Sequence, residues 1–201
     1  DEWTEVVMAR DGIEIARFTM ESKLRQEAPE VVKELSHGRE TWILSGDKPG
    51  PVALVAKACS IPPERALSGQ SPEDKLRVVQ ELAKRGKVLF VGDGINDAAA
   101  LKAAQIGVGV QGGAAAALTS CDVYLARDDL RLLCKLVTAS RQVRRHIVSA
   151  LVWSTLWNLL GVTLVLTGFL GPVVCAILMP LSSIMVVGYA LTRRPFPKET
   201  P

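Results

Sequence analysis

The chain has 201 residues, of which 48% are hydrophobic and 22% are charged, and its formal net charge is +3. This length and apolar content suffice for the core of one ordinary domain together with further apolar segments. The charge is modest and the basic residues are not interleaved with aromatic ones, which argues against nucleic acid as a partner. The four cysteines are scattered and form no Cys-x-x-Cys pair, so neither a zinc knuckle nor a disulfide framework is indicated.

The first two thirds of the sequence predict an α/β domain. Residues 5–9 and 13–18 are β-prone runs around Asp11-Gly12, a dipeptide typical of tight hairpin turns. Apolar runs then alternate with helical stretches, a pattern that favours a parallel sheet covered on both faces. The expected strands are 41–44, 88–91, 106–110 and 122–125, and the expected helices are 27–36, 51–59, 72–85, 97–104 and 114–120.

The last third predicts two membrane-spanning helices. No charged residue and no histidine occurs between Ile147 and Thr192, and Gly171-Pro172 interrupts this stretch near its middle. Two helices of about 22 residues would each measure about 33 Å, enough to cross a hydrocarbon layer of about 30 Å. We expect spans at about 147–169 and 172–192, with a helix from about 129 running into the first. The basic residues on both flanks place both ends in the cytoplasm: Arg141, Arg144, Arg145, Arg193, Arg194 and Lys198.

One loop carries the strongest chemical pattern. Asp93 and Asp97 lie in a glycine-rich turn directly after the expected strand 88–91. Glycines allow the tight turn that brings acidic side chains to the carboxyl end of a buried strand. Carboxylate oxygens suit Mg²⁺, a hard cation that prefers oxygen ligands. The sequence therefore predicts a magnesium site in this loop.

Three segments in order resemble the phosphorylation domain of P-type ATPases, ion pumps of the haloacid-dehalogenase-like superfamily. Residues 92–97 resemble the Gly-Asp-Gly-x-Asn-Asp loop, residues 72–75 resemble Pro-x-Asp-Lys, and residues 45–47 resemble Thr-Gly-Asp, with serine in place of threonine. The resemblance implies Mg²⁺ and ATP as cofactors. It assigns Mg²⁺ to Asp93 with Asp97, and phosphate-site roles to a set comprising Ser45, Gly46, Asp47, Lys75, Asn96 and Asp97.

The resemblance also implies a missing partner. The pumps are phosphorylated on the Asp of Asp-Lys-Thr-Gly-Thr, and this segment does not occur in the chain. Asp47-Lys48 is superficially similar but lacks the threonines, so Asp47 is read as part of Thr-Gly-Asp. We expect a C-terminal portion of a pump, either a fragment or half of a split protein, that is inactive alone. Its partners would be the missing N-terminal part, with the phosphorylated Asp, the nucleotide and actuator domains and the other helices.

The implied fold class is α/β, with an incomplete Rossmann-like parallel sheet of a haloacid-dehalogenase-like phosphorylation domain followed by a two-helix transmembrane hairpin. Residues 1–20 would end the nucleotide-binding domain and 21–135 would belong to the phosphorylation domain. Residues 136–194 would form the hairpin and 195–201 a cytoplasmic tail.

Residues inside the two spans indicate the transported metal. A chain that ends in two helices resembles the heavy-metal branch of these pumps. Trp157-Asn158 resembles the Tyr-Asn of copper pumps, and residues 179–183 resemble their Met-x-x-Ser-Ser. The implied Cu⁺ ligands are Asn158, Met179 and Ser183, and Cys175 shares the helix face of Met179. Sulfur donors favour Cu(I) over harder ions.

The sequence thus predicts part of an ATP-driven Cu(I)-translocating ATPase that is integral to the cell membrane. The lipid bilayer and a copper chaperone are the further expected partners. Three alternatives stay open at this point. They are a pump for Zn²⁺, cadmium or another heavy metal, a membrane-anchored haloacid-dehalogenase-like phosphatase, and a non-catalytic partner protein.

Overall fold

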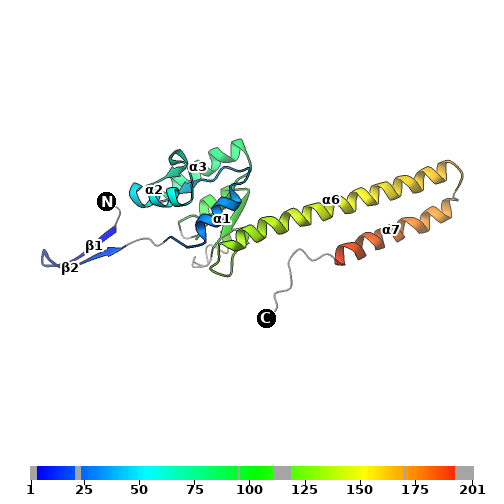
Figure 1. The fold of residues 1–201 in the computed structure, drawn as a ribbon. Coiled ribbons are helices and arrows are strands. Elements are labelled where there is room, and N and C mark those ends of the chain that lie inside the picture. The colour runs from blue at the N-terminus through cyan, green and yellow to red at the C-terminus, as the bar shows by residue number, and fades with distance from the viewer. Residues whose placement is uncertain (1–3, 21–23, 95, 111–118, 170, 193–201) are drawn as a thin grey trace. The chain divides into compact units, whose positions relative to one another are not determined.

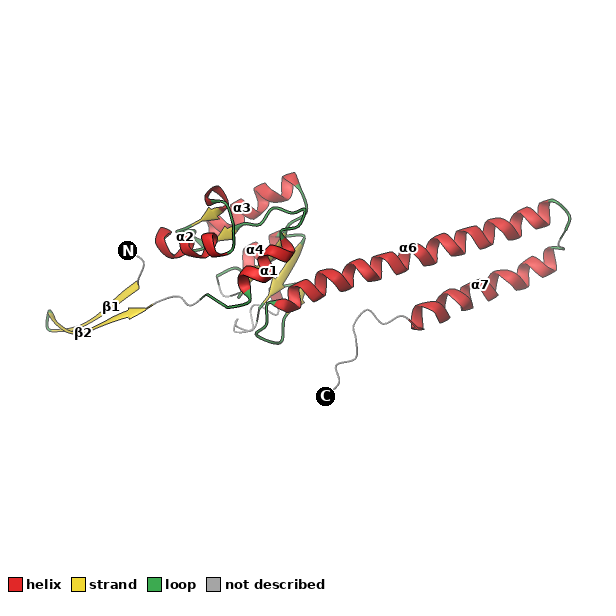
Figure 2. Cartoon of the chain, viewed as in Figure 1, coloured by secondary structure: helices red, strands yellow, loops and turns green. Residues whose placement is uncertain are grey.

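The computed structural model describes residues 4–20, 24–94, 96–110, 119–169 and 171–192. The chain divides into two units, residues 1–134 and 135–201. Among the described residues, the first contains the strands and the short helices, and the second contains most of one long helix and all of another (Figure 1 and Figure 2).

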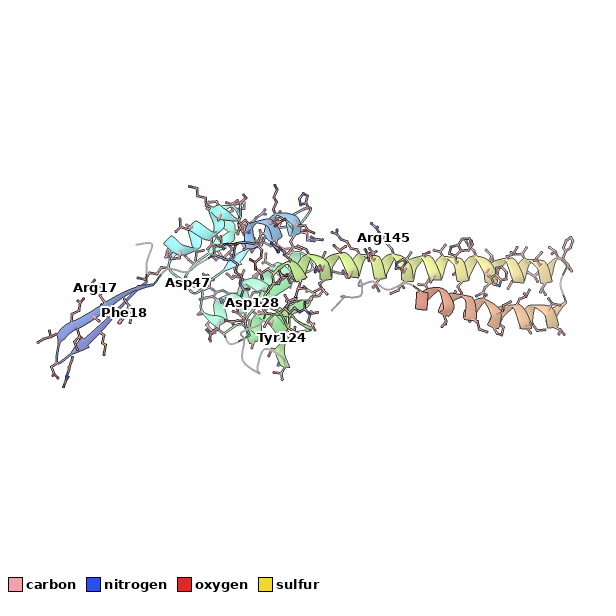
Figure 3. The ribbon with its side chains drawn as sticks, turned by 60° about the horizontal axis from the view of Figure 1, so that its bottom comes forward. Arg17, Phe18, Asp47, Tyr124, Asp128 and Arg145 are labelled. Carbon is pink, nitrogen blue, oxygen red and sulfur yellow. The ribbon has the colours of Figure 1, made fainter. Side chains whose placement is uncertain are left out.

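The predicted hairpin at the N-terminus is confirmed. Strands β1 (Thr4–Arg10) and β2 (Ile13–Met20) pair antiparallel. Both residues of the connecting turn have positive φ, 53° at Asp11 and 81° at Gly12, as a type I′ turn requires. Arg17 and Phe18 are neighbours on β2 (Figure 3), and Arg17 donates two hydrogen bonds to the Glu14 carboxylate.

The α/β unit follows the predicted order of elements. Its helices are α1 (Ala28–Leu35), α2 (Pro49–Ala58), α3 (Pro72–Arg85) and α4 (Ala98–Ala103). Its strands are β3 (Ile43–Leu44), β4 (Ala66–Leu67), β5 (Leu89–Gly92), β6 (Ile106–Gly109) and β7 (Val123–Tyr124), with a 3₁₀ turn at Pro63–Arg65. The 3₁₀ turn and β4 were not predicted. The expected helix 114–120 lies mostly outside the described residues.

The strands are parallel, as predicted, and they form two sheets. Strand β3 pairs with β4, and β5, β6 and β7 form a second sheet in that order. Among the described residues, β3 and β5 are therefore each paired along one edge only. The parallel pairing of the predicted α/β fold is confirmed, and β4, which was not predicted, supplies the partner of β3.

Small and branched apolar side chains form the core of this unit. Val79 of α3, Leu101 of α4 and Val108 of β6 are almost completely buried. A Cβ added to Gly107 would lie 2.6 Å from the backbone oxygen of Leu101, so α4 packs directly on the β6 backbone at this glycine. A separate cluster around Ala56, Cys59 and Ile61 joins α2 to β3 and β4. The described cysteines, at positions 59, 121 and 134, are free thiols.

The second unit consists of helix α6 (Arg131–Leu166), which begins at the end of the first unit, and helix α7 (Pro172–Thr192). The prediction that one helix continues without a break into the uncharged stretch is confirmed, although α6 ends at Leu166 and not at 169. A turn with Gly168 at a φ of 77° follows, and α7 runs back beside α6 (Figure 1). Among the described residues, α6 is the one helix whose length and composition suffice for a membrane crossing. A crossing by α7 stays a prediction.

Candidate functional site

The first candidate segment, Ser45 to Asp47, is the loop at the carboxyl end of β3. Main-chain hydrogen bonds tie it to β4 and to the loop that follows β4: Ser45 N–H donates to the Leu67 oxygen at 2.9 Å, and Gln70 N–H donates to the Ser45 oxygen at 2.9 Å. The Asp47 N–H donates to the Ser45 hydroxyl at 3.1 Å. Gly46 and Asp47 are exposed, so the loop presents a hydroxyl, main-chain N–H groups and a carboxylate at one sheet edge.

The second segment begins helix α3 with a capping box. The Ser71 hydroxyl accepts a hydrogen bond from Asp74 N–H at 3.1 Å and donates to the Asp74 carboxylate at 2.9 Å. The Ser71 N–H donates to the same carboxylate at 3.2 Å, which completes the reciprocal pair. These bonds from Ser71, with the nearby Arg77, hold the pKa of Asp74 below its ordinary value. The cap fixes the first turn of α3, and therefore the starting point of the Lys75 side chain.

Lys75 is not a solvated surface lysine. Its Nζ donates to Asp97 Oδ1 at 2.8 Å, and the side chains of Lys75 and Asp97 are only 13% and 12% exposed. This ion pair joins the start of α3 to the residue that precedes α4. The structure thus brings together two of the predicted site residues that lie on different motifs.

Gly92, the last residue of β5, is required by this arrangement. A Cβ at this position would lie 2.6 Å from Asp97 Oδ2 and 2.9 Å from Asp97 Cβ. Any larger residue would push the Asp97 side chain away and so disrupt its ion pair with Lys75. The sequence analysis assigned this glycine only to the tight turn that brings the acidic side chains to the strand end.

The predicted magnesium residues differ in their surroundings. Asp93 follows β5 directly and is exposed, as is Asn96, whereas Asp97 is committed through Oδ1 to Lys75. Ile95, between them, lies outside the described residues. Within the described part of the chain, no group of three His, Cys, Asp or Glu side chains comes together as a metal site. An exposed carboxylate at a strand end fits Mg²⁺ bound mostly through water and phosphate oxygens, so Asp93 fits this ion better than Asp97 does.

The residues expected along the metal path lie on α6 and α7. The side-chain oxygen of Asn158 is buried and has no hydrogen-bond partner among the described atoms. Ser183 is exposed, while its neighbour Ser182 is 7% exposed. The side chains of Cys175 and Met179 lie outside what the structure describes. Ser182 belongs to the same Met-x-x-Ser-Ser segment but was not among the predicted ligands.

Two further polar contacts support the sheet that carries the loop of Asp93. The Asp122 carboxylate accepts a hydrogen bond from Gly107 N–H at 2.8 Å, which ties the segment before β7 to β6. The Gln105 side-chain oxygen accepts one from Val88 N–H at 2.6 Å, just before β5. Neither role was predicted, because a polar residue next to a short strand has no distinctive sequence pattern.

Comparison with known proteins places the chain in a family. A model of haloacid dehalogenase-like hydrolases matches residues 2–105. The chain is 36% identical over 183 residues to the chloroplastic copper-transporting ATPase PAA1 of Arabidopsis thaliana, a match that covers 90% of this chain and 18% of that protein. It is 35% identical over 193 residues to a copper-exporting P-type ATPase of Legionella pneumophila, covering 92% of this chain and 26% of the relative.

Solved structures agree with the sequence relatives. A zinc-transporting PIB-type ATPase in its E2.Pi state superposes with a TM-score of 0.81 at 26% identity, over 95% of this chain and 31% of that one. The catalytic domain of the CPx-ATPase CopB-B matches with a TM-score of 0.55 at 32% identity, over 63% of this chain and 51% of the domain. The chain therefore belongs to the haloacid dehalogenase-like hydrolases, and over most of its length it is similar to a portion of heavy-metal P-type ATPases.

Proposed function

We propose that this chain is part of an ATP-driven Cu(I)-translocating P-type ATPase. Within that pump it supplies residues of the phosphate site and two helices of the metal path. One observation carries the proposal: the buried Lys75–Asp97 ion pair lies beside Asp93 in the loop at the end of a parallel strand. A lysine and an aspartate held there are the groups that a site for a phosphorylated side chain and its Mg²⁺ needs.

The phosphate-side residues have compatible chemistry. Lys75 is a compact cation that neutralises phosphate charge. The Ser45 hydroxyl and the Gly46 N–H are donors for a phosphoryl oxygen, and the Asp47 N–H holds the Ser45 oxygen in place. Asp93 would hold Mg²⁺, which supplies charge neutralisation for phosphoryl transfer when bound. Asp97 keeps Lys75 in place, and Asn96 would orient phosphate or water.

The open strand edges indicate where the phosphorylated aspartate belongs. The candidate residues follow β3 and β5, each of which has one unpaired edge in the described part of the chain. A strand from another segment of the pump that paired between them would end beside Ser45 and Asp93. Parallel strands place the residues at their carboxyl ends along one sheet edge, so an aspartate following such a strand would meet both loops.

The metal path is supported by Asn158. An unpartnered amide oxygen buried in an apolar helix is costly, and polar groups within membrane spans usually serve a pathway. Asn158, Met179 and Ser183 are the proposed Cu⁺ ligands, with Cys175 as a further sulfur donor and Ser182 as an added candidate. The similarity to copper-transporting ATPases supports Cu⁺ as the transported ion. The similarity to the structure of a zinc-transporting ATPase makes Zn²⁺ the alternative.

The test uses the complete pump, reconstituted in proteoliposomes, with ATP-dependent uptake of Cu(I) and Zn(II) measured side by side. We expect uptake of Cu(I), a loss of at least tenfold in Asp93→Asn, and wild-type uptake in the matched control Asp128→Asn, which is an exposed acid outside the site. Asn158→Leu should lose Cu(I)-dependent phosphorylation by ATP but keep Mg²⁺-dependent phosphorylation by inorganic phosphate.

Two results would contradict the proposal. Uptake of Zn(II) without Cu(I) would show that the metal assignment is wrong and that the zinc alternative holds. Acid-stable, hydroxylamine-labile ³²P on the purified 201-residue chain would show that it carries its own phosphorylated carboxylate. In the proposed arrangement both ends of the helical hairpin are cytoplasmic, and a copper chaperone would deliver Cu⁺ from that side.

A further inference from the structure

The segment of α6 just before its uncharged stretch is strongly basic. Arg141, Arg144 and Arg145 are exposed, and Figure 3 shows Arg145 on this part of the helix. The sequence contains no Asp or Glu between Leu130 and Thr192, so no carboxylate of this stretch neutralises the arginines. Their function is not explained by the phosphate site or the metal path.

The depth of these arginines follows from the helix itself. The uncharged part of α6, from Ile147 to Leu166, would measure about 30 Å, which matches the hydrocarbon thickness of a bilayer. The headgroup layer adds roughly 5–7 Å on each side. Arg145 and Arg144 lie about 3 and 5 Å before Ile147 along the axis, and Arg141 about 9 Å before it. The three guanidinium groups therefore fall at or next to the headgroup layer.

We propose that Arg141, Arg144 and Arg145 bind the headgroups of anionic phospholipids in the headgroup layer beside α6. Arginine binds phosphate through a planar fork of donors, and its long side chain reaches a headgroup while its stem stays in apolar surroundings. The inference rests on the proposed function only in requiring that α6 crosses a bilayer.

The size of the effect follows from surface electrostatics. One basic residue near an anionic membrane surface contributes about a fivefold preference, so three independent arginines give a preference on the order of 100-fold for anionic over zwitterionic lipid. Lys135 provides a matched control on the same helix. It is exposed but lies about 18 Å before Ile147, beyond the headgroup layer and more than a Debye length away.

The experiment places the full chain in phosphatidylcholine nanodiscs and measures quenching of tryptophan fluorescence by dibrominated lipids. Trp153 and Trp157 lie on α6 within the uncharged stretch and report on nearby lipid. Dibrominated phosphatidylserine is compared with dibrominated phosphatidylcholine at equal mole fraction. Discs have no preset orientation, so a variant cannot fail merely by inserting the wrong way round. Far-ultraviolet circular dichroism checks that each variant remains helical.

For the wild-type chain we expect phosphatidylserine to be preferred at least tenfold. The variant R141Q/R144Q/R145Q should lower this preference to within twofold of unity, and K135Q should leave it unchanged. An equal response to both lipids in the wild type, an unchanged preference in the triple variant, or an equal loss in K135Q would overturn the proposal. Displacement of the serine lipid by 10 mM inorganic phosphate would overturn it too, because the site would then bind a soluble anion. Absence of quenching by either lipid would instead contradict the membrane crossing of the proposed function.

Discussion

The Lys75–Asp97 ion pair gives the most demanding test of the site geometry. The two groups are 2.8 Å apart and nearly buried, so removal of one partner leaves the other charge poorly solvated. Breaking a buried pair typically costs 3–5 kcal/mol. Since both side chains keep some exposure, we expect Lys75→Met to lower the free energy of unfolding by about 3 kcal/mol, at the lower end of this range. Asp97→Leu should lower it by a similar amount. At about 3 °C per kcal/mol, each variant should melt roughly 9 °C below the wild type.

The double variant K75M/D97L tests whether the cost of each single variant comes from the charge that it leaves unpaired. Replacing both charged groups with apolar side chains leaves no unpaired charge. The double variant should therefore lose less unfolding free energy than the two single variants lose together, by at least about 2 kcal/mol. The matched control is the Glu81–Lys84 pair, which has the same 2.8 Å separation but side chains that are 56% and 70% exposed. Lys84→Met should shift the melting temperature by no more than about 1 °C, because solvent screens an exposed pair.

The melting assay uses the full chain in detergent micelles with a fluorogenic maleimide that labels cysteine thiols as they become accessible. Cys59 is buried in the α/β unit, and burial raises the pKa of its thiol, so its labelling follows unfolding of that unit. A melting temperature of Lys75→Met within 2 °C of the wild type would refute the reasoning. So would a double variant that shows the plain sum of the two single losses.

Two further predictions concern stability. Gly107→Ala should lower the unfolding free energy by about 1–3 kcal/mol, because the new Cβ would lie 2.6 Å from the Leu101 backbone oxygen. The control Gly86→Ala, whose new Cβ would have no neighbouring atom within 4 Å, should have little effect in the same melting assay. Ser71→Ala should cost about 1 kcal/mol through loss of the cap of α3. The Ser71 hydroxyl holds the pKa of Asp74 below its unfolded value of about 3.9, so this contribution is present above about pH 5 and lost as the pH falls through the folded pKa. The melting difference between wild type and Ser71→Ala should therefore shrink in acid, and a difference that grew would contradict the assignment.

Local hydrogen bonding made parts of the fold predictable. The Asp11-Gly12 turn needs positive φ at two successive residues, and this requirement selects the hairpin from the dipeptide alone. Helix α3 was predicted with both of its observed ends, because Ser71 caps its start and Gly86 follows its last residue. The continuity of α6 into the uncharged stretch likewise follows from composition, since nothing in residues 131–166 interrupts a helix.

Long-range pairing was not predictable in the same way. A two-residue strand such as β4 shows no periodicity, and its identity as a strand depends on the parallel partner that Ile43 and Leu44 provide. The motifs indicated that Lys75 and Asp97 belong to a phosphate site, but no spacing rule shows that these two side chains, 22 residues apart, form an ion pair.

The sequence by itself determined which chemistry this protein carries: acidic and basic groups in three ordered loops, followed by an uncharged stretch long enough for two spans. Each of those features lies within one continuous segment of the chain, and local propensity and composition are enough to specify it. Only the tertiary structure decided that Asp97 faces Lys75, that Gly92 must remain a glycine, and that the Asn158 oxygen is buried without a partner. Lys75 and Asp97 are 22 residues apart, and this pair depends on how the elements between them pack. No local sequence pattern specifies the close approach of Gly92 to Asp97 or the surroundings of Asn158.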